Sequence, residues 1–117
     1  MISISDHNEV FIAGGDDDKV HVYLNLGDNF VNDHALTDSS SDVNIADITG
    51  DGKWILSTDE SRNIRIYKFD LKTHKYELYQ TISSPSSVYG GTITDDHMWM
   101  VFAGYNDYVY IYTFNGN

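Results

Sequence analysis

The chain has 117 residues, the length of one domain, and 41% of them are apolar, which is enough to build a core. Seven basic and eighteen acidic residues give a net charge of −11, and this field repels phosphate backbones, so we expect binding neither to nucleic acid nor to membrane. The absence of cysteine excludes disulfides, thiolate nucleophiles and cysteine-ligated zinc. No apolar run is long enough to span a bilayer, and we expect a soluble, cytoplasmic protein.

The predicted elements are short strands separated by polar turns. The chain opens partway into a first strand, where Met1 aligns with Ile45, and an alternating segment from Val10 to Tyr23 follows. The clearest stretch then contains four predicted strands: Val43 to Thr49, Trp54 to Thr58, Ile64 to Phe69 and Tyr76 to Ile82. No stretch keeps apolar residues at helical spacing, so we expect essentially no helix.

Two landmarks show that this pattern repeats along the chain. Three alternating segments each close on a tyrosine, and an isoleucine upstream of each segment repeats at the same intervals of 44 and 45 residues: Tyr23, Tyr67 and Tyr112, with Ile4, Ile48 and Ile93. Four short strands in every 44 or 45 residues are the signature of a β-propeller blade. We therefore predict an all-β fold of about eleven strands, in four-stranded antiparallel blades at residues 1–42, 43–87 and 88–117, the last without its fourth strand.

The segment AGGDDDKVHVY, residues 13–23, resembles the second and third strands of a WD-repeat blade, and IRIYKFD and VYIYTFN resemble that family's closing strand. Tyrosine stands where the family usually has tryptophan. In the family an aspartate six residues before the closing aromatic braces a tight turn; Asp17 matches it, and Ser61 and Asn106 occupy the same place as turn formers. The resemblance implies a non-catalytic scaffold that binds protein partners.

WD-repeat propellers use the turns between the second and third strands for partner recognition, so the resemblance places candidate contacts there. They are Asp16, Asp18, Glu60, Arg62, Tyr105, Asn106, Asp107 and Tyr108. Exposed tyrosine is a favoured interface anchor, which singles out Tyr105 and Tyr108.

Asp47 to Gly52 offers the alternative, a calcium-dependent propeller module of integrin-type or lectin-like character. Oxygen ligands alternate around a glycine turn there, but the carboxylate that should follow is replaced by Trp54, Ile55 and Leu56, which favours a plain β-turn. The five histidines are scattered, and consecutive Asp16, Asp17 and Asp18 point in different directions. We expect no metal site, no cofactor and no enzymatic activity.

Propeller blades bury their sheet faces against one another, and closed rings usually need four to eight blades. An arc of fewer than three blades would leave two apolar faces uncovered. We therefore expect either a piece of a longer protein or self-association, most simply two chains that close a six-bladed ring.

Overall fold

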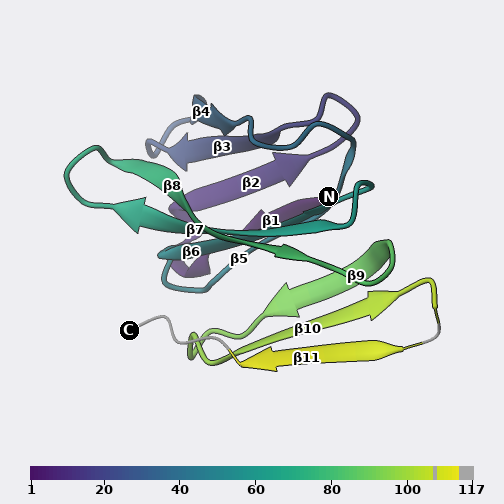
Figure 1. Ribbon diagram of the computed structural model, residues 1–117. Coiled ribbons are helices and arrows are strands. Elements are labelled where there is room, and N and C mark those ends of the chain that lie inside the picture. Colours follow the sequence, from purple (N-terminus) through teal and green to yellow (C-terminus); the bar gives the residue numbers. More distant parts are fainter. Residues whose placement is uncertain (107, 114–117) are drawn as a thin grey trace.

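The structure, a computed structural model, describes residues 1–106 and 108–113. Within these residues, eleven strands form three antiparallel sheets that follow one another along the chain (Figure 1). This confirms the predicted all-β fold of propeller blades. Helical geometry is confined, within the described residues, to a three-residue 3-10 turn at Asp6–Asn8, and none of them lies in a helix long and apolar enough to cross a membrane.

Each sheet is a meander in which consecutive strands pair. The first sheet, blade 1, contains β1 (Ile2–Ile4), β2 (Val10–Gly14), β3 (Val20–Asn25) and β4 (Phe30–Leu36). Blade 2 contains β5 (Val43–Ile48), β6 (Trp54–Asp59), β7 (Asn63–Asp70) and β8 (Lys75–Ser83). Blade 3 contains β9 (Val88–Ile93), β10 (Trp99–Gly104) and β11 (Val109–Thr113). The strands predicted for blade 2 end within one residue of the observed bounds.

One hydroxyl in each blade closes the turn between the first and second strands. The Thr49 N–H donates to the Trp54 carbonyl at 3.0 Å, and the Trp54 N–H donates back to Thr49 Oγ1 at 3.2 Å. The same reciprocal pair recurs in blades 1 and 3, as Ser5 with Val10 and Thr94 with Trp99. The repeat seen in the sequence is therefore also a repeat of local hydrogen bonding.

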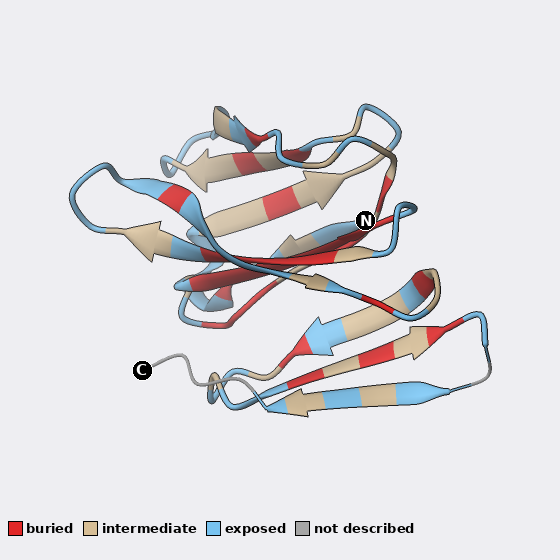
Figure 2. Ribbon diagram, viewed as in Figure 1, coloured by how far each residue is buried: buried red, intermediate tan, exposed pale blue. Residues whose placement is uncertain are grey.

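Two apolar cores lie between the blades (Figure 2). The core between blades 1 and 2 is made of Ile12, Val20, Val22, Leu36, Val43, Ala46, Ile48, Ile55, Tyr67 and Tyr76. The core between blades 2 and 3 is made of Ile45, Trp54, Leu56, Ile64, Ile66, Val88, Ile93, Met100 and Phe102. Blade 2 is covered on both faces, so all six residues of β6 and residues 64–67 of β7 are buried.

Candidate interaction surface

The turns that join second and third strands lie at one end of the three sheets, because each blade is an antiparallel meander (Figure 1). Within the described residues they comprise 15–19, 60–62, 105, 106 and 108, and the connections between blades reach the same end. This end holds all the candidate contact residues that the structure describes. Asp107 lies outside the described residues.

In blade 1 the turn carries three aspartates with different surroundings. Asp17 Oδ2 lies 2.6 Å from His21 Nε2, and Asp17 Oδ1 accepts the Lys19 N–H at 3.3 Å. The hydrogen bond to His21 holds the pKa of Asp17 below its ordinary value. Asp17 thus ties the turn to β3, whereas Asp16 is exposed to solvent.

Asp16 and Asp18 form an acidic group with Asp42, which comes from the connection between blades 1 and 2. Desolvation raises the pKa of Asp42 above its ordinary value, and the negative charges of Asp16 and Asp18 raise it further. The group therefore concentrates negative potential at this end of blade 1, where it would complement positive charge on a partner.

In blade 2 the candidates Glu60 and Arg62 are exposed, and Arg62 adopts a left-handed backbone with φ of 66°. Between them, Ser61 binds the connection from blade 1: its N–H and hydroxyl lie 3.1 and 2.9 Å from Ser41 Oγ. Ser61 therefore joins the turn to the preceding connection, and the charged side chains on either side of it remain in solvent.

The turn of blade 2 is braced by a residue that our reading of the sequence missed. Asp59 accepts hydrogen bonds from the Arg65 guanidinium, from Ser39 Oγ at 2.8 Å and from the Asn63 N–H at 3.1 Å. Asp59 is 1% exposed and Arg65 is 8% exposed. Desolvation opposes the charge on Asp59, but its three donors outweigh that effect, and the pKa lies below its ordinary value.

Arg65 gives the signal that could have found this brace, because a charged residue at an interior position of β7 needs a buried partner. Its counterparts are His21 in β3 and Tyr110 in β11, and each contacts the turn of its own blade. His21 contacts Asp17, and Tyr110 accepts a hydrogen bond from the Asn106 amide. The three blades thus use three different pairs for one structural task.

Blade 3 presents tyrosines at this end of the molecule. Tyr105 is 70% exposed and Tyr108 is 67% exposed. The rings of Tyr105 and Tyr89 lie 4.8 Å apart between centroids, and Tyr89 is 55% exposed. Asn106 Oδ1 accepts the Tyr108 N–H at 3.4 Å, which holds the turn. Tyr105 thus contacts Tyr89, which the sequence did not single out, and Tyr108 lies in the same turn as Tyr105. These three exposed tyrosines, Tyr89, Tyr105 and Tyr108, are called the tyrosine surface of blade 3.

Asp47 and Asp51, the carboxylates of the calcium alternative, are engaged in separate hydrogen bonds. Asp47 Oδ1 accepts Ser3 Oγ–H of blade 1 at 2.8 Å, while Asp47 Oδ2 accepts Thr92 Oγ1–H of blade 3 at 2.8 Å. Asp51 Oδ1 accepts the Lys53 N–H at 3.0 Å, and Asp51 Oδ2 lies 2.8 Å from His97 Nε2. Within residues 1–106 and 108–113, no three His, Asp or Glu side chains are grouped to hold a metal ion.

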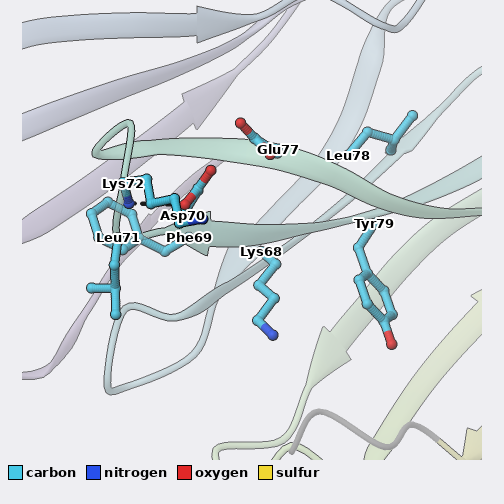
Figure 3. A pocket seen from close by; sticks show the side chains of 8 residues that line it. All are labelled: Lys68, Phe69, Asp70, Leu71, Lys72, Glu77, Leu78 and Tyr79. Atoms are coloured by element: carbon cyan, nitrogen blue, oxygen red, sulfur yellow. Dashed lines mark hydrogen bonds between the residues drawn. The ribbon is translucent and has the colours of Figure 1, made fainter.

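A hollow of about 400 Å³ lies at the other end of blade 2, on the hairpin of β7 and β8 (Figure 3). Its lining residues are Lys68, Phe69, Asp70, Leu71, Lys72, Glu77, Leu78 and Tyr79. Lys68 and Tyr79 point to the same side of the hairpin in Figure 3, toward blade 3. The ring of Tyr79 contacts Trp54 edge-on at 5.0 Å, and Lys68 Nζ lies 5.5 Å from the centre of the Trp54 ring.

Comparison with known proteins identifies the fold through structure and not through sequence. No family model and no curated protein sequence matches the chain. Among solved structures, the chain is similar to Sqt1 of Saccharomyces cerevisiae, with a TM-score of 0.82 and 16% sequence identity, over 97% of this chain and 31% of the yeast protein. The chain thus spans about a third of that WD40 propeller protein. At this identity the likeness shows the fold alone, a run of β-propeller blades.

Proposed function

We propose that the chain is a non-catalytic protein-interaction scaffold whose partner contacts the turns between the second and third strands. The observation that carries the proposal is the tyrosine surface of blade 3, where Tyr105, Tyr108 and Tyr89 are all more than half exposed. Tyrosine buries a large area at low cost in side-chain entropy, so clustered exposed tyrosines are favoured anchors for a protein partner.

The acidic group of blade 1 lies at the same end and suggests the partner's charge. Within the described residues, Asp16, Asp18 and Asp42 form no ion pair with Lys or Arg, and the whole chain carries a net charge of −11. A basic partner surface would be attracted over a distance of about 10 Å at moderate ionic strength. We propose a cytoplasmic partner with basic residues near an apolar patch that covers the tyrosines.

The test replaces Tyr105 and Tyr108 together by alanine and identifies, by mass spectrometry, the proteins that the chain captures from its source cell. Loss of specific partners with an unchanged melting temperature is expected. Leu26→Ala is the matched control, because Leu26 is 65% exposed in a turn at the other end of blade 1. Equal capture by both variants, or a fall in the melting temperature of the tyrosine variant alone, would overturn the proposal.

The uncovered faces of the arc support self-association. Four apolar side chains form the face of blade 2 that packs on blade 3: Trp54, Leu56, Ile64 and Ile66. Their counterparts 45 residues later in blade 3 are Trp99, Val101, Val109 and Ile111. Trp54 is 1% exposed but Trp99 is 41% exposed, and Ile66 is 0% exposed but Ile111 is 64% exposed. Blade 3 thus presents the type of face that, in blade 2, is covered by a neighbour.

At the other end of the arc, the uncovered face of blade 1 corresponds to the face of blade 2 that packs on blade 1. Ile48 of blade 2 is 4% exposed against blade 1, whereas its counterpart Ile4 is 48% exposed. Phe11 and Tyr23 stack on each other at 4.7 Å on the same face. We propose that blade 3 of one chain packs on blade 1 of a second chain, and that two such head-to-tail junctions close a six-bladed ring.

A further inference from the structure

The outer edges of blades 1 and 2 are protected against pairing with another strand. Each edge strand carries charged or ionisable side chains, Asp33 and His34 in β4, Lys75 and Glu77 in β8. Each edge strand also contains a β-bulge, where the register shifts opposite Tyr23 and opposite Tyr67. Charges and bulges are the usual means by which proteins prevent unwanted strand addition.

The outer strand of blade 3 has neither kind of protection. β11 reads Val-Tyr-Ile-Tyr-Thr, with no charge and no proline, and it pairs with β10 in continuous register. Val109 and Ile111 are 65% and 64% exposed. β-branched and aromatic residues favour the strand conformation, so β11 is built like an interior strand that has another strand on its far side.

The free main-chain groups of β11 can be assigned residue by residue. Tyr108 accepts the Gly104 N–H through its carbonyl, so the main chain of Tyr108 points toward β10, and that of Tyr110 and Tyr112 does the same. The N–H and C=O groups of Val109, Ile111 and Thr113 therefore point away from β10. The corresponding strand of blade 2, β7, alternates in the same way. The Phe69 N–H donates to the Lys53 carbonyl on the β6 side, so the main-chain groups of Ile64, Ile66 and Lys68 point toward β8.

β8, the fourth strand of blade 2, contacts β4, the fourth strand of blade 1. These contacts show where the fourth strand of one blade lies relative to the preceding blade. In β4 the bulge residue Asp33 lies 3.3 Å from Lys75 Nζ of β8, and the neighbouring His34 Nε2 accepts the Tyr76 N–H at 3.3 Å. Tyr79 is the bulge residue of β8 and so the counterpart of Asp33. Tyr79 is 53% exposed and lines the hollow of Figure 3. By the repeat, a strand added to β11 would run past this hollow.

We propose that β11 is a strand-addition site, at which an extended segment of a separate polypeptide pairs antiparallel with β11 and completes blade 3. The segment takes β-branched or aromatic residues on the side that faces blade 2, where a side chain enters the hollow beside Leu71 and Tyr79. A carboxylate in the segment can pair with Lys68 or Lys72, which share the lining with Asp70 and Glu77. The site uses the outer strand edge, and therefore neither the turn surface nor the sheet faces of the proposed ring.

The experiment uses a labelled synthetic peptide with the sequence of residues 75–83, because this segment is the fourth strand of blade 2 and contains tyrosine, leucine and glutamate. Saturable binding to the 117-residue chain, followed by fluorescence anisotropy, is expected. Hydrogen exchange should slow at the amides of Val109, Ile111 and Thr113, while the amides of Tyr110 and Tyr112 change little. Absence of binding, or protection without this alternation, would contradict strand addition.

A matched pair of variants locates the contact. Thr113→Pro removes an outward N–H without removing a bond to β10, and proline is tolerated at sheet edges. It should weaken peptide binding about tenfold or more, whereas Thr113→Val, which keeps the N–H, should bind like the native chain. Equal affinity of the two variants would overturn the site. The Tyr105 and Tyr108 double variant should bind the peptide normally, so failure here and failure of the turn surface are distinguishable.

Discussion

Arg65 and Asp59 form a buried ion pair that closes the turn between β6 and β7 of blade 2. Ser39, from the connection between blades 1 and 2, binds the same carboxylate. One side chain therefore orders the turn and the connection beside it, and the positions of Glu60 and Arg62 on the candidate surface depend on this support.

Replacement of Arg65 by methionine should lower the free energy of unfolding by about 3–5 kcal/mol, because it leaves the Asp59 carboxylate buried without its cation. Arg62→Met is the control, since it removes the same charge from an exposed position in the same turn. The control should change stability by no more than about 0.5 kcal/mol. The free energies of unfolding of the two variants are compared by urea unfolding at equal protein concentration. Similar decreases in both variants would contradict a stabilising role for the Arg65–Asp59 pair.

The same pair predicts how stability responds to acid. The pKa of Asp59 is lowered in the folded chain, so its contribution is fully present above the unfolded-state value of about 4 and is lost as the pH falls through the lower folded-state pKa. In the Arg65→Met chain, burial without the cation should raise the pKa of Asp59 instead. The stability difference between native chain and variant should therefore shrink below about pH 4. A difference that stays constant from pH 7 to pH 2.5 in urea unfolding would contradict the assignment.

Asp47 links all three blades at the innermost strands. It accepts hydrogen bonds from Ser3 of β1 and from Thr92 of β9, and the Ile93 N–H donates to it at 3.1 Å. Asp47→Ala should cost about 2 kcal/mol of stability, because these donors lose a charged acceptor in a partly buried place. Asp47→Asn keeps one acceptor oxygen and should cost less.

For Asp47 the reference is Asp16→Ala, a loss of one carboxylate from an exposed turn, which should leave the melting temperature almost unchanged. Scanning calorimetry of the three variants ranks them. If Asp47→Ala and Asp16→Ala have the same melting temperature, the hydrogen bonds of Asp47 between the inner strands do not hold the blades together.

Head-to-tail closure predicts an unusual result when two defective variants are mixed. Ile4→Glu damages only the free face of blade 1, and Ile111→Glu damages only the free face of blade 3. Each variant alone should sediment as one protomer, because both junctions of its ring contain a damaged face. The equimolar mixture should recover two-protomer particles, since one of its two junctions is intact.

The native chain and Leu26→Glu, which changes an exposed leucine in a turn, should both sediment as two protomers. A native mass of one folded protomer would refute self-association. A mixture that stays at one protomer would instead point to a junction in which each face meets its own copy.

Local sequence was sufficient for the strands and for the end of the molecule at which the candidate turns meet. Alternation in Ile64 to Phe69 and the turn at Gly50 to Lys53 are short-range signals, and an antiparallel meander places alternate turns at the same end without further information. Asp59 could not be found in this way, because the repeat has glycine at its counterparts, Gly15 and Gly104. The tyrosine at position 89 was also missed, since its contact with Tyr105 joins residues that are distant along the chain.

Trp54 and Trp99 share a local conformation that the sequence determined, but they differ in burial, which only the tertiary structure decided. Both begin the second strand of their blade, and their N–H groups donate to the threonine hydroxyl five residues earlier at 3.2 and 3.1 Å. The repeat of 45 residues determines this local conformation, because turn and strand preferences act within a few residues. Trp54 is nevertheless 1% exposed and Trp99 41% exposed. A sheet face loses its contact with water only when another blade covers it, and that cover comes from residues far away along the chain or from another molecule.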